Sequence, residues 1–142
     1  MRWLLCGKLT PAAADALRRH EHHAQFALEA GLTADAPPDE VLRAAAKLQM
    51  DVMTDDPAIA SAPFGGEITF ARTIVYLLVG PGDVEQDDAV DRLFKRYARL
   101  SPGRLYTVTN SRVKVRQLPG SARSGKTNRK AAGAEWIVEE SE

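Results

Sequence analysis

Cysteine is almost absent from this 142-residue chain, in which Cys6 is the single one. One cysteine excludes a disulfide within the chain and is typical of a reducing compartment, so we expect a cytoplasmic location. No apolar run is long enough to cross a bilayer, and we expect no membrane association. The apolar residues 1–6 run into Gly, Lys and Pro without a cleavage-like site, which predicts a strand and not a signal peptide.

A net charge is absent too, because 19 basic and 19 acidic residues cancel. The charges are nevertheless unevenly placed: residues 1–100 carry 11 Lys and Arg against 15 Asp and Glu, whereas residues 101–142 carry eight against four. Between Arg104 and Lys130 there are eight basic residues and no acidic one. Such a segment attracts phosphate. The alternative is a solvated strand edge followed by a tail, which is common for charge blocks at chain ends.

Apolar strand-like segments alternate with amphipathic helical ones along most of the sequence. Strands are predicted at residues 2–6, 24–28, 51–54 and 73–79, and helices begin near Thr10, Asp39 and Val84. Two alternating segments, 105–109 and 113–118, flank Asn110-Ser111 and predict a hairpin. We therefore expect an α/β fold, with a mainly parallel sheet, helices on both faces, 73–79 central and the hairpin at an edge.

The domain is predicted to span residues 1–118. Gly, Ser, Lys, Arg, Asn and Ala dominate the following stretch, so 119–142 is predicted to be a flexible basic tail. Its end holds a short apolar segment, Ala134 to Glu140, which either adds to a sheet edge or binds a partner.

Candidate site residues follow from the rule that ligands bind beyond the carboxyl ends of parallel strands. Cys6-Gly7-Lys8, Asp55-Asp56 and Gly80-Pro81-Gly82 occupy such positions, and Asp39-Glu40 at a helix start faces the same crevice. Carboxylates clustered at strand ends are typical magnesium or manganese ligands, and two such ions activate water against a phosphodiester.

Three short motifs carry a family resemblance. Residues 4–9, L-L-C-G-K-L, correspond to a first strand ending L-L-D-E-N-L, residues 38–42 to an acidic helix start, and residues 54–59, T-D-D-P-A-I, to T-x-D-x-D-F. Together with the later strand, the long helix and the hairpin, they resemble the short, toxin-like bacterial PIN-like ribonucleases from Arg2 to about Leu118. The resemblance implies a PIN-like domain and a metal-dependent nuclease site.

That implied site is incomplete in this sequence. Cys6 stands where the family has its first metal-binding aspartate, and Ala58 where it has the second aspartate of T-x-D-x-D. The resemblance leaves three residual acidic positions as catalytic candidates: Asp39, Glu40 and Asp56. Two of them, Asp56 and Asp39, are also the candidate metal ligands. Lys8 adds a positive charge where the cation would sit.

Each of these residues also has a structural interpretation. Asp56 precedes a proline and is typical of a cap, and Asp39 is typical of a helix N-cap. A lone Cys6 at a strand end is more often a buried filler than a nucleophile. His20, His22 and His23 are typical of a solvated helix exit and not of a metal cluster.

The resulting prediction is a catalytically degenerate nuclease fold without a cofactor, acting in nucleic-acid or partner binding. RNA or a small antitoxin-like protein is the expected partner. The alternative is a magnesium- or manganese-dependent endoribonuclease, the toxin of a toxin–antitoxin pair, and a further one is an interaction module that uses the C-terminal tail. The predicted nucleic-acid-binding residues are Lys8, Arg104, Arg112, Lys114 and Arg116.

Overall fold

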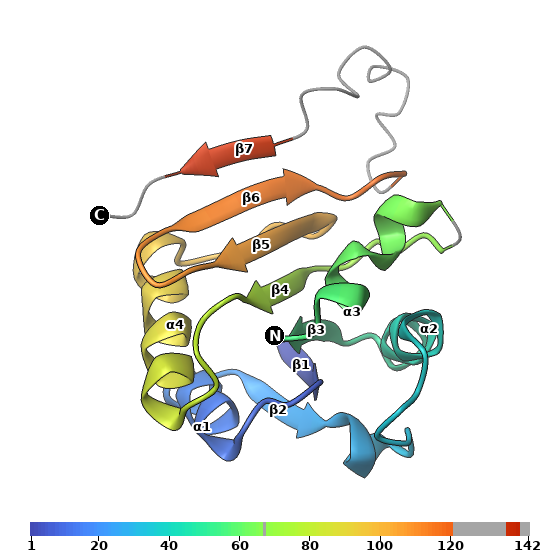
Figure 1. Cartoon of the computed structure of the whole chain (residues 1–142), viewed down its shortest axis with the longest axis horizontal. Helices are drawn as coiled ribbons and strands as arrows, with labels where there is room; N and C mark the ends of the chain where they lie inside the picture. The colour runs from blue at the N-terminus through green and yellow to red at the C-terminus, as the bar shows by residue number, and fades with distance from the viewer. Residues whose placement is uncertain (67, 121–135, 140–142) are drawn as a thin grey trace.

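Seven strands form one sheet in the computed structural model, which describes residues 1–66, 68–120 and 136–139. The strand order is β2-β1-β3-β4-β5-β6-β7 (Figure 1). The first five are parallel to one another, and β6 and β7 run antiparallel to their neighbours. Their bounds are β1 Arg2–Cys6, β2 His23–Phe26, β3 Asp51–Thr54, β4 Ile74–Leu77, β5 Arg104–Val108, β6 Val113–Gln117 and β7 Trp136–Glu139. The predicted mainly parallel sheet is confirmed.

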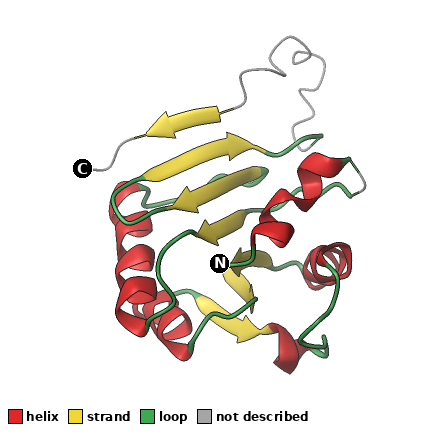
Figure 2. Cartoon of the chain, in the orientation of Figure 1, coloured by secondary structure: helices red, strands yellow, loops and turns green. Residues whose placement is uncertain are grey.

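Helices cover both faces of this sheet, as predicted (Figure 2). One face, called the α1/α4 face, packs against α1 (Pro11–Arg19) and α4 (Asp83–Arg96). The other, called the α2/α3 face, packs against α2 (Pro38–Leu48) and the short α3 (Pro57–Ser61). Two 3₁₀ turns, η1 (Ala27–Ala30) and η2 (Ala62–Gly65), complete the second layer. In the described part of the chain, no helix has the length and apolarity that crossing a membrane requires.

The central position of β4 follows from its composition. Val75 and Leu77 are buried on the α1/α4 face, whereas Ile74 is buried on the α2/α3 face. A strand covered on both faces must be apolar on both, which explains its continuous apolar sequence. The strand is shorter than the predicted 73–79, although its neighbours still bond to the adjacent strands: the Val52 N–H donates to the Thr73 carbonyl oxygen (2.9 Å), and the Leu78 N–H donates to the Val108 carbonyl oxygen (2.8 Å).

The C-terminal end of the sheet begins with the predicted hairpin. β5 and β6 pair antiparallel in the register Leu105↔Arg116 and Thr107↔Lys114. β7 pairs with β6 on the outside, so the short apolar segment adds to the sheet edge, one of its two predicted alternatives. The rest of the predicted flexible tail, residues 121–135 and 140–142, lies outside the described residues.

Two of the three histidines pack between α1, β1 and α4, so the predicted solvated helix exit is wrong for them. Trp3 Nε1 donates to His22 Nδ1 (3.1 Å), and His20 Nε2 lies 2.8 Å from an Asp91 carboxylate oxygen. Both imidazoles stack near the Phe94 ring, with centroids 5.0 Å and 4.7 Å away. The local sequence of residues 20–23 does not reveal that two of these side chains contact α4.

Acid should weaken the fold through His22. Burial, and then the nearby N-terminal amine, His20 and His23, lower the pKa of His22 from 6.5 to about 4. Tryptophan only donates, so the Trp3 bond also requires an unprotonated Nδ1. The unfolded chain therefore binds a proton that the native chain rejects, and the free energy of unfolding should fall as pH drops from about 7 to about 4.

The measurement is urea unfolding across that range for wild type, His22→Gln and the exposed-site control His23→Gln. Glutamine offers an acceptor oxygen and does not titrate. His22→Gln should flatten the pH dependence, whereas His23→Gln should change it far less, because the charge of His23 is the smallest of the four causes that lower the pKa of His22. Equal slopes in all three proteins would contradict the assignment.

Candidate functional site

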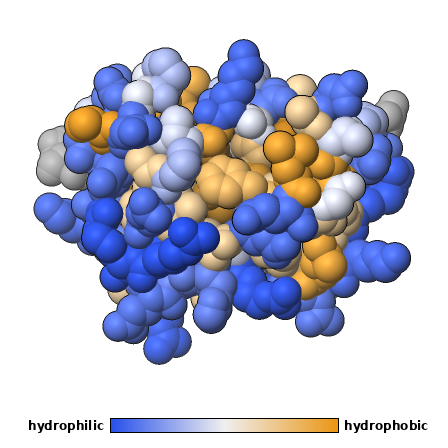
Figure 3. All heavy atoms as spheres, turned by 90° about the horizontal axis from the view of Figure 1, so that it is seen from below, coloured by the Kyte–Doolittle hydropathy of each residue, from blue (hydrophilic) through white to orange (hydrophobic). Residues whose placement is uncertain are grey.

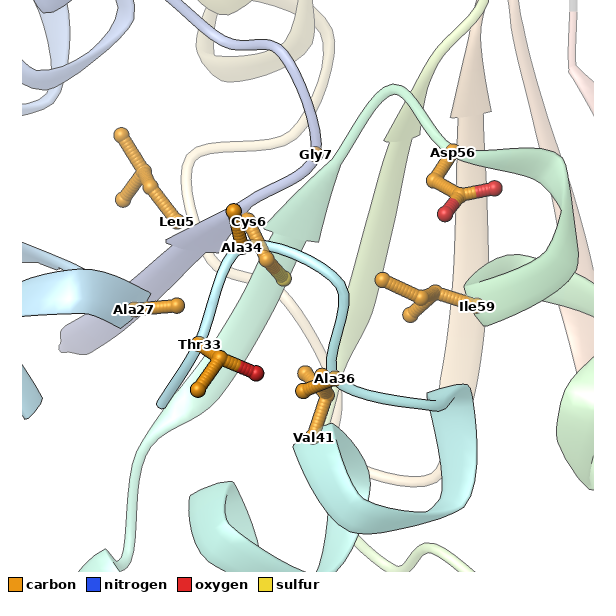
Figure 4. A pocket seen from close by; sticks show the side chains of 10 residues that line it. All are labelled: Leu5, Cys6, Gly7, Ala27, Thr33, Ala34, Ala36, Val41, Asp56 and Ile59. Carbon is orange, nitrogen blue, oxygen red and sulfur yellow. The ribbon is translucent and has the colours of Figure 1, made fainter. Parts of the chain in front are cut away.

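The candidate site lies where the sheet changes winding direction. β1 lies between β2 and β3, and the chain leaves β1 toward α1 on one face but leaves β3 toward α3 on the other. Diverging connections of this kind open a crevice beyond the carboxyl ends of the two strands. A pocket occupies this place (Figure 4), and its lining residues are Leu5, Cys6, Gly7, Ala27, Thr33, Ala34, Ala36, Val41, Asp56 and Ile59.

This pocket is small, and its surface is polar and apolar in about equal parts. Its volume is about 80 Å³, whereas sites for drug-sized ligands have several hundred. Figure 4 shows the Cys6 side chain pointing between the 33–36 loop and Ile59, with Asp56 near the rim. The pocket has room for a few water molecules and not for a nucleotide.

Cys6 is a buried thiol. Its Sγ lies 3.8 Å from the Met53 carbonyl oxygen, and only 7% of the residue is exposed. Burial raises the pKa of Cys6 to about 12, the charges of Asp56 and Asp55 act in the same direction, and a hydrogen bond with Thr54 opposes them. Because the thiolate is the nucleophilic and metal-binding form, Cys6 is inert at neutral pH.

Asp55 clamps the chain as it leaves β1. The Lys8 backbone N–H donates to Asp55 Oδ1 (2.8 Å), and Gly7 adopts a φ of +88°. A Cβ at Gly7 would collide with the Asp55 carboxylate and lie 3.1 Å from Thr54 Oγ1. The carboxylate therefore binds the turn that follows β1.

Asp56 caps α3, the structural alternative that its sequence position offered. Its Oδ1 accepts from the Ala58 N–H (2.9 Å), while its own N–H donates to Thr54 Oγ1 (3.0 Å). Ala58, at the family's second aspartate position, lies exposed in the first turn of α3.

The acidic start of α2 does not line the pocket. Pro37 is the N-cap and Pro38 the first helical residue, so the prediction that Asp39 caps this helix is wrong. Proline suits the first position because its missing N–H needs no partner there. Asp39 Oδ2 instead lies 2.7 Å from Arg43 Nη1, and this hydrogen bond lowers the pKa of Asp39. Glu40 is exposed, and α2 reaches the pocket through Val41.

A polar row crosses the sheet beside this site. Register partners point to the same face, and Cys6↔Thr54, Thr54↔Tyr76, Tyr76↔Thr107 and Thr107↔Lys114 are consecutive partners on the α2/α3 face. Burial, followed by the charges of Asp55 and Asp56, raises the pKa of Tyr76, so its hydroxyl stays protonated. The sequence analysis did not single out Thr54, Tyr76 or Thr107, although each is a polar residue inside an apolar strand.

The predicted basic residues do not share one surface. Lys114 and Arg116 lie on the α2/α3 face, where the Arg116 guanidinium carbon lies 3.8 Å from the centroid of the Phe64 ring. Arg104 pairs with Gln117 and follows the alternation of Tyr106, which places it on the α1/α4 face. Arg112 precedes β6, and Lys8 is exposed after β1.

The donor set does not fit the magnesium or manganese ion that the family resemblance implies. Such cations need several oxygen ligands. Here Cys6 is a protonated thiol, Asp39 is paired with Arg43, and Asp55 and Asp56 each accept a backbone N–H. Within residues 1–66, 68–120 and 136–139, no group of three or more His, Cys, Asp or Glu side chains is placed to hold a metal.

Comparison with known proteins finds no matching family, no matching curated protein and no matching solved structure.

Substitution at Gly7 should reveal the Asp55 clamp. Gly7→Ala should lower the free energy of unfolding by about 2–3 kcal/mol, because it adds a steric conflict to the strain of a left-handed residue. Gly31 is the matched control, since its φ is +95° but nothing lies within 4 Å of an added Cβ. Gly31→Ala should cost only about 1 kcal/mol.

Urea unfolding of both variants, and of Gly7→Ala combined with Asp55→Ala, provides the measurement. The excess cost at Gly7 should shrink once the carboxylate is removed. Equal losses at Gly7 and Gly31 would show that Asp55 does not constrain this turn.

Proposed function

We propose that this chain is a PIN-like domain that has lost phosphodiester cleavage and acts by binding. The order of its elements and the motifs at residues 4–9, 38–42 and 54–59 support the resemblance. The observation that carries the loss of activity is Cys6, a buried protonated thiol at the position of the family's first metal-binding aspartate.

The remaining carboxylates do not compensate for Cys6. Metal-assisted hydrolysis of a phosphodiester needs oxygen ligands that converge on the cation and its water. Asp56 caps α3, Asp55 holds the turn after β1, and Asp39 pairs with Arg43 along its own helix. Each therefore stabilises a different local structure.

A protein partner is favoured over RNA. Arg104 lies on the opposite face of the sheet from Lys114 and Arg116, so the five predicted basic residues do not all contribute to one surface for a phosphate backbone. The single buried cysteine supports a cytoplasmic location for this activity.

A metal-dependent ribonuclease is the second candidate. The adjacent carboxylates of Asp55 and Asp56 create a negative field at the strand ends, and after burial, the larger cause, this field contributes to the raised pKa of Tyr76. A cation attracted by this field would have to draw further ligands from water.

The purified chain should not cleave RNA above background with either magnesium or manganese. The lost ligands lower the affinity for the cation and no longer position the attacking water. The measurement is an RNA cleavage assay beside calorimetric titration with each metal, on wild type and Asp56→Asn. Asparagine also caps helices well, so this variant should keep its fold.

A double substitution, Cys6→Asp with Ala58→Asp, restores both family aspartates and serves as the comparison for metal binding. Metal-dependent cleavage by wild type that disappears in Asp56→Asn would establish the ribonuclease and overturn the proposal.

A further inference from the structure

The outer backbone groups at the two ends of the sheet are satisfied in different ways. At β2, side chains form hydrogen bonds with them. The His23 N–H donates to the Met1 carbonyl oxygen, so alternation turns the backbone groups of Ala24 and Phe26 away from β1. Arg18 Nη2 donates to the Ala24 carbonyl oxygen (3.1 Å), and the Phe26 N–H donates to Glu29 Oε1 (2.7 Å). Figure 3, viewed from this side, shows apolar side chains ringed by hydrophilic ones. An incoming strand would have to break both bonds.

At the other end, β6 is closed by another strand. Hydrogen bonds from the Thr109 N–H to Arg112 and from the Leu118 N–H to Gly103 show that even-numbered residues of this segment face β5. The backbone groups of Val113, Val115 and Gln117 therefore face outward, toward β7. β7 pairs there in the register Val113↔Glu139 and Val115↔Ile137.

β6 keeps its place without β7. All five of its residues pair with β5, and Val113 and Val115 are buried in the core under α4. Loss of β7 would therefore expose a preformed edge and not unfold the hairpin. A preformed edge with unpaired N–H and carbonyl groups accepts an extended peptide.

The segment that contains β7 is acidic, and β6 is basic. Lys114 and Arg116 lie on β6 opposite Val138 and Trp136, with Arg112 just before the strand. Residues 134–142 contain four glutamates and no basic residue, and three of the four lie outside the paired strand. The two strands are also joined through residues 118–135 and not by a tight turn. β7 is therefore tethered to β6 without being fixed by a short connection.

We propose that the outer edge of β6 is a docking site for an extended, apolar segment of a partner protein flanked by acidic residues. Trp136–Glu139 occupies this edge within the chain and is displaced when the partner binds. The partner's backbone pairs with Val113, Val115 and Gln117, and its acidic residues flank this pairing, where the positive charges of β6 attract them. This inference names the partner class of the proposed binding function but does not need the PIN-like assignment.

A partner must compete with the tethered strand β7 for the outer edge of β6. A strand tethered over such a connection competes at an effective concentration on the order of 1 mM. A second copy of the chain offers only the same strand at far lower concentration, so pairing at this edge within one chain is favoured over pairing between copies. A partner strand that also reaches Gln117 extends the described pairing, which covers Val113 to Arg116.

The test measures binding of a fluorescent peptide, residues 134–142, to the full-length chain by anisotropy. Ile137 pairs with Val115 and donates toward β6, whereas the Val138 N–H points away from it. Ile137→Pro removes the donor and should tighten peptide binding at least about tenfold. Val138→Pro, the matched control, should bind as wild type does. Thermal unfolding checks that both variants remain folded.

Two further variants fix the location of binding. Lys114 and Val138 are register partners, so Lys114→Cys with Val138→Cys should form a disulfide within one chain, while native Cys6 stays unreactive. The oxidised protein should lose peptide binding and recover it on reduction. Lys114→Glu in the Ile137→Pro chain should weaken binding several-fold.

Several outcomes would overturn the proposal: no peptide binding by Ile137→Pro, equal binding by the oxidised and reduced proteins, or an RNA oligonucleotide that displaces the peptide. Because none of these measurements involves cleavage or metals, their failure is distinct from failure of the proposed loss of nuclease activity.

Discussion

The hydrogen bond from the Lys8 N–H to the Asp55 carboxylate joins the segments that follow β1 and β3, and the layer of α1 and α4 depends on this connection. It fixes the turn after β1, and thereby the point at which the chain enters α1. From there Thr10 caps α1, and its N–H donates to the buried Gln86 of α4 (2.9 Å). One carboxylate thus connects the sheet to both helices of the α1/α4 face.

The same hydrogen bond limits which groups of the crevice are available to bind a ligand. A turn with a left-handed glycine exposes backbone N–H groups that bind anions well. Here the Lys8 N–H already donates to Asp55, which directly follows β3, and the Asp56 carboxylate already accepts an N–H of α3. The N–H and carboxylate groups that could contact a substrate form hydrogen bonds within the protein instead. The site is therefore better suited to holding a shape than to stabilising a reacting phosphate.

The sequence allowed prediction of the elements whose signal is local. β1, β3 and the hairpin were recognised from apolar or alternating runs, and Thr10-Pro11 marked the start of α1 correctly. Proline at the first position of α2 displaced the cap from Asp39, just as Pro11 occupies the first position of α1. Features that depend on neighbours in space were missed: the imidazoles against Phe94 require α4, and the polar row requires the register of five strands.

The two tryptophans of this chain lie in parts of the sheet that are far apart in strand order. Trp3 is fully buried in β1 and bonded to an imidazole, whereas Trp136 belongs to the outermost strand. Intrinsic fluorescence of a version that keeps only Trp3 would therefore report on the contact between β1 and the α1/α4 layer. The chain thus carries an optical probe in its interior, at the position where the first strand meets the helix that follows it.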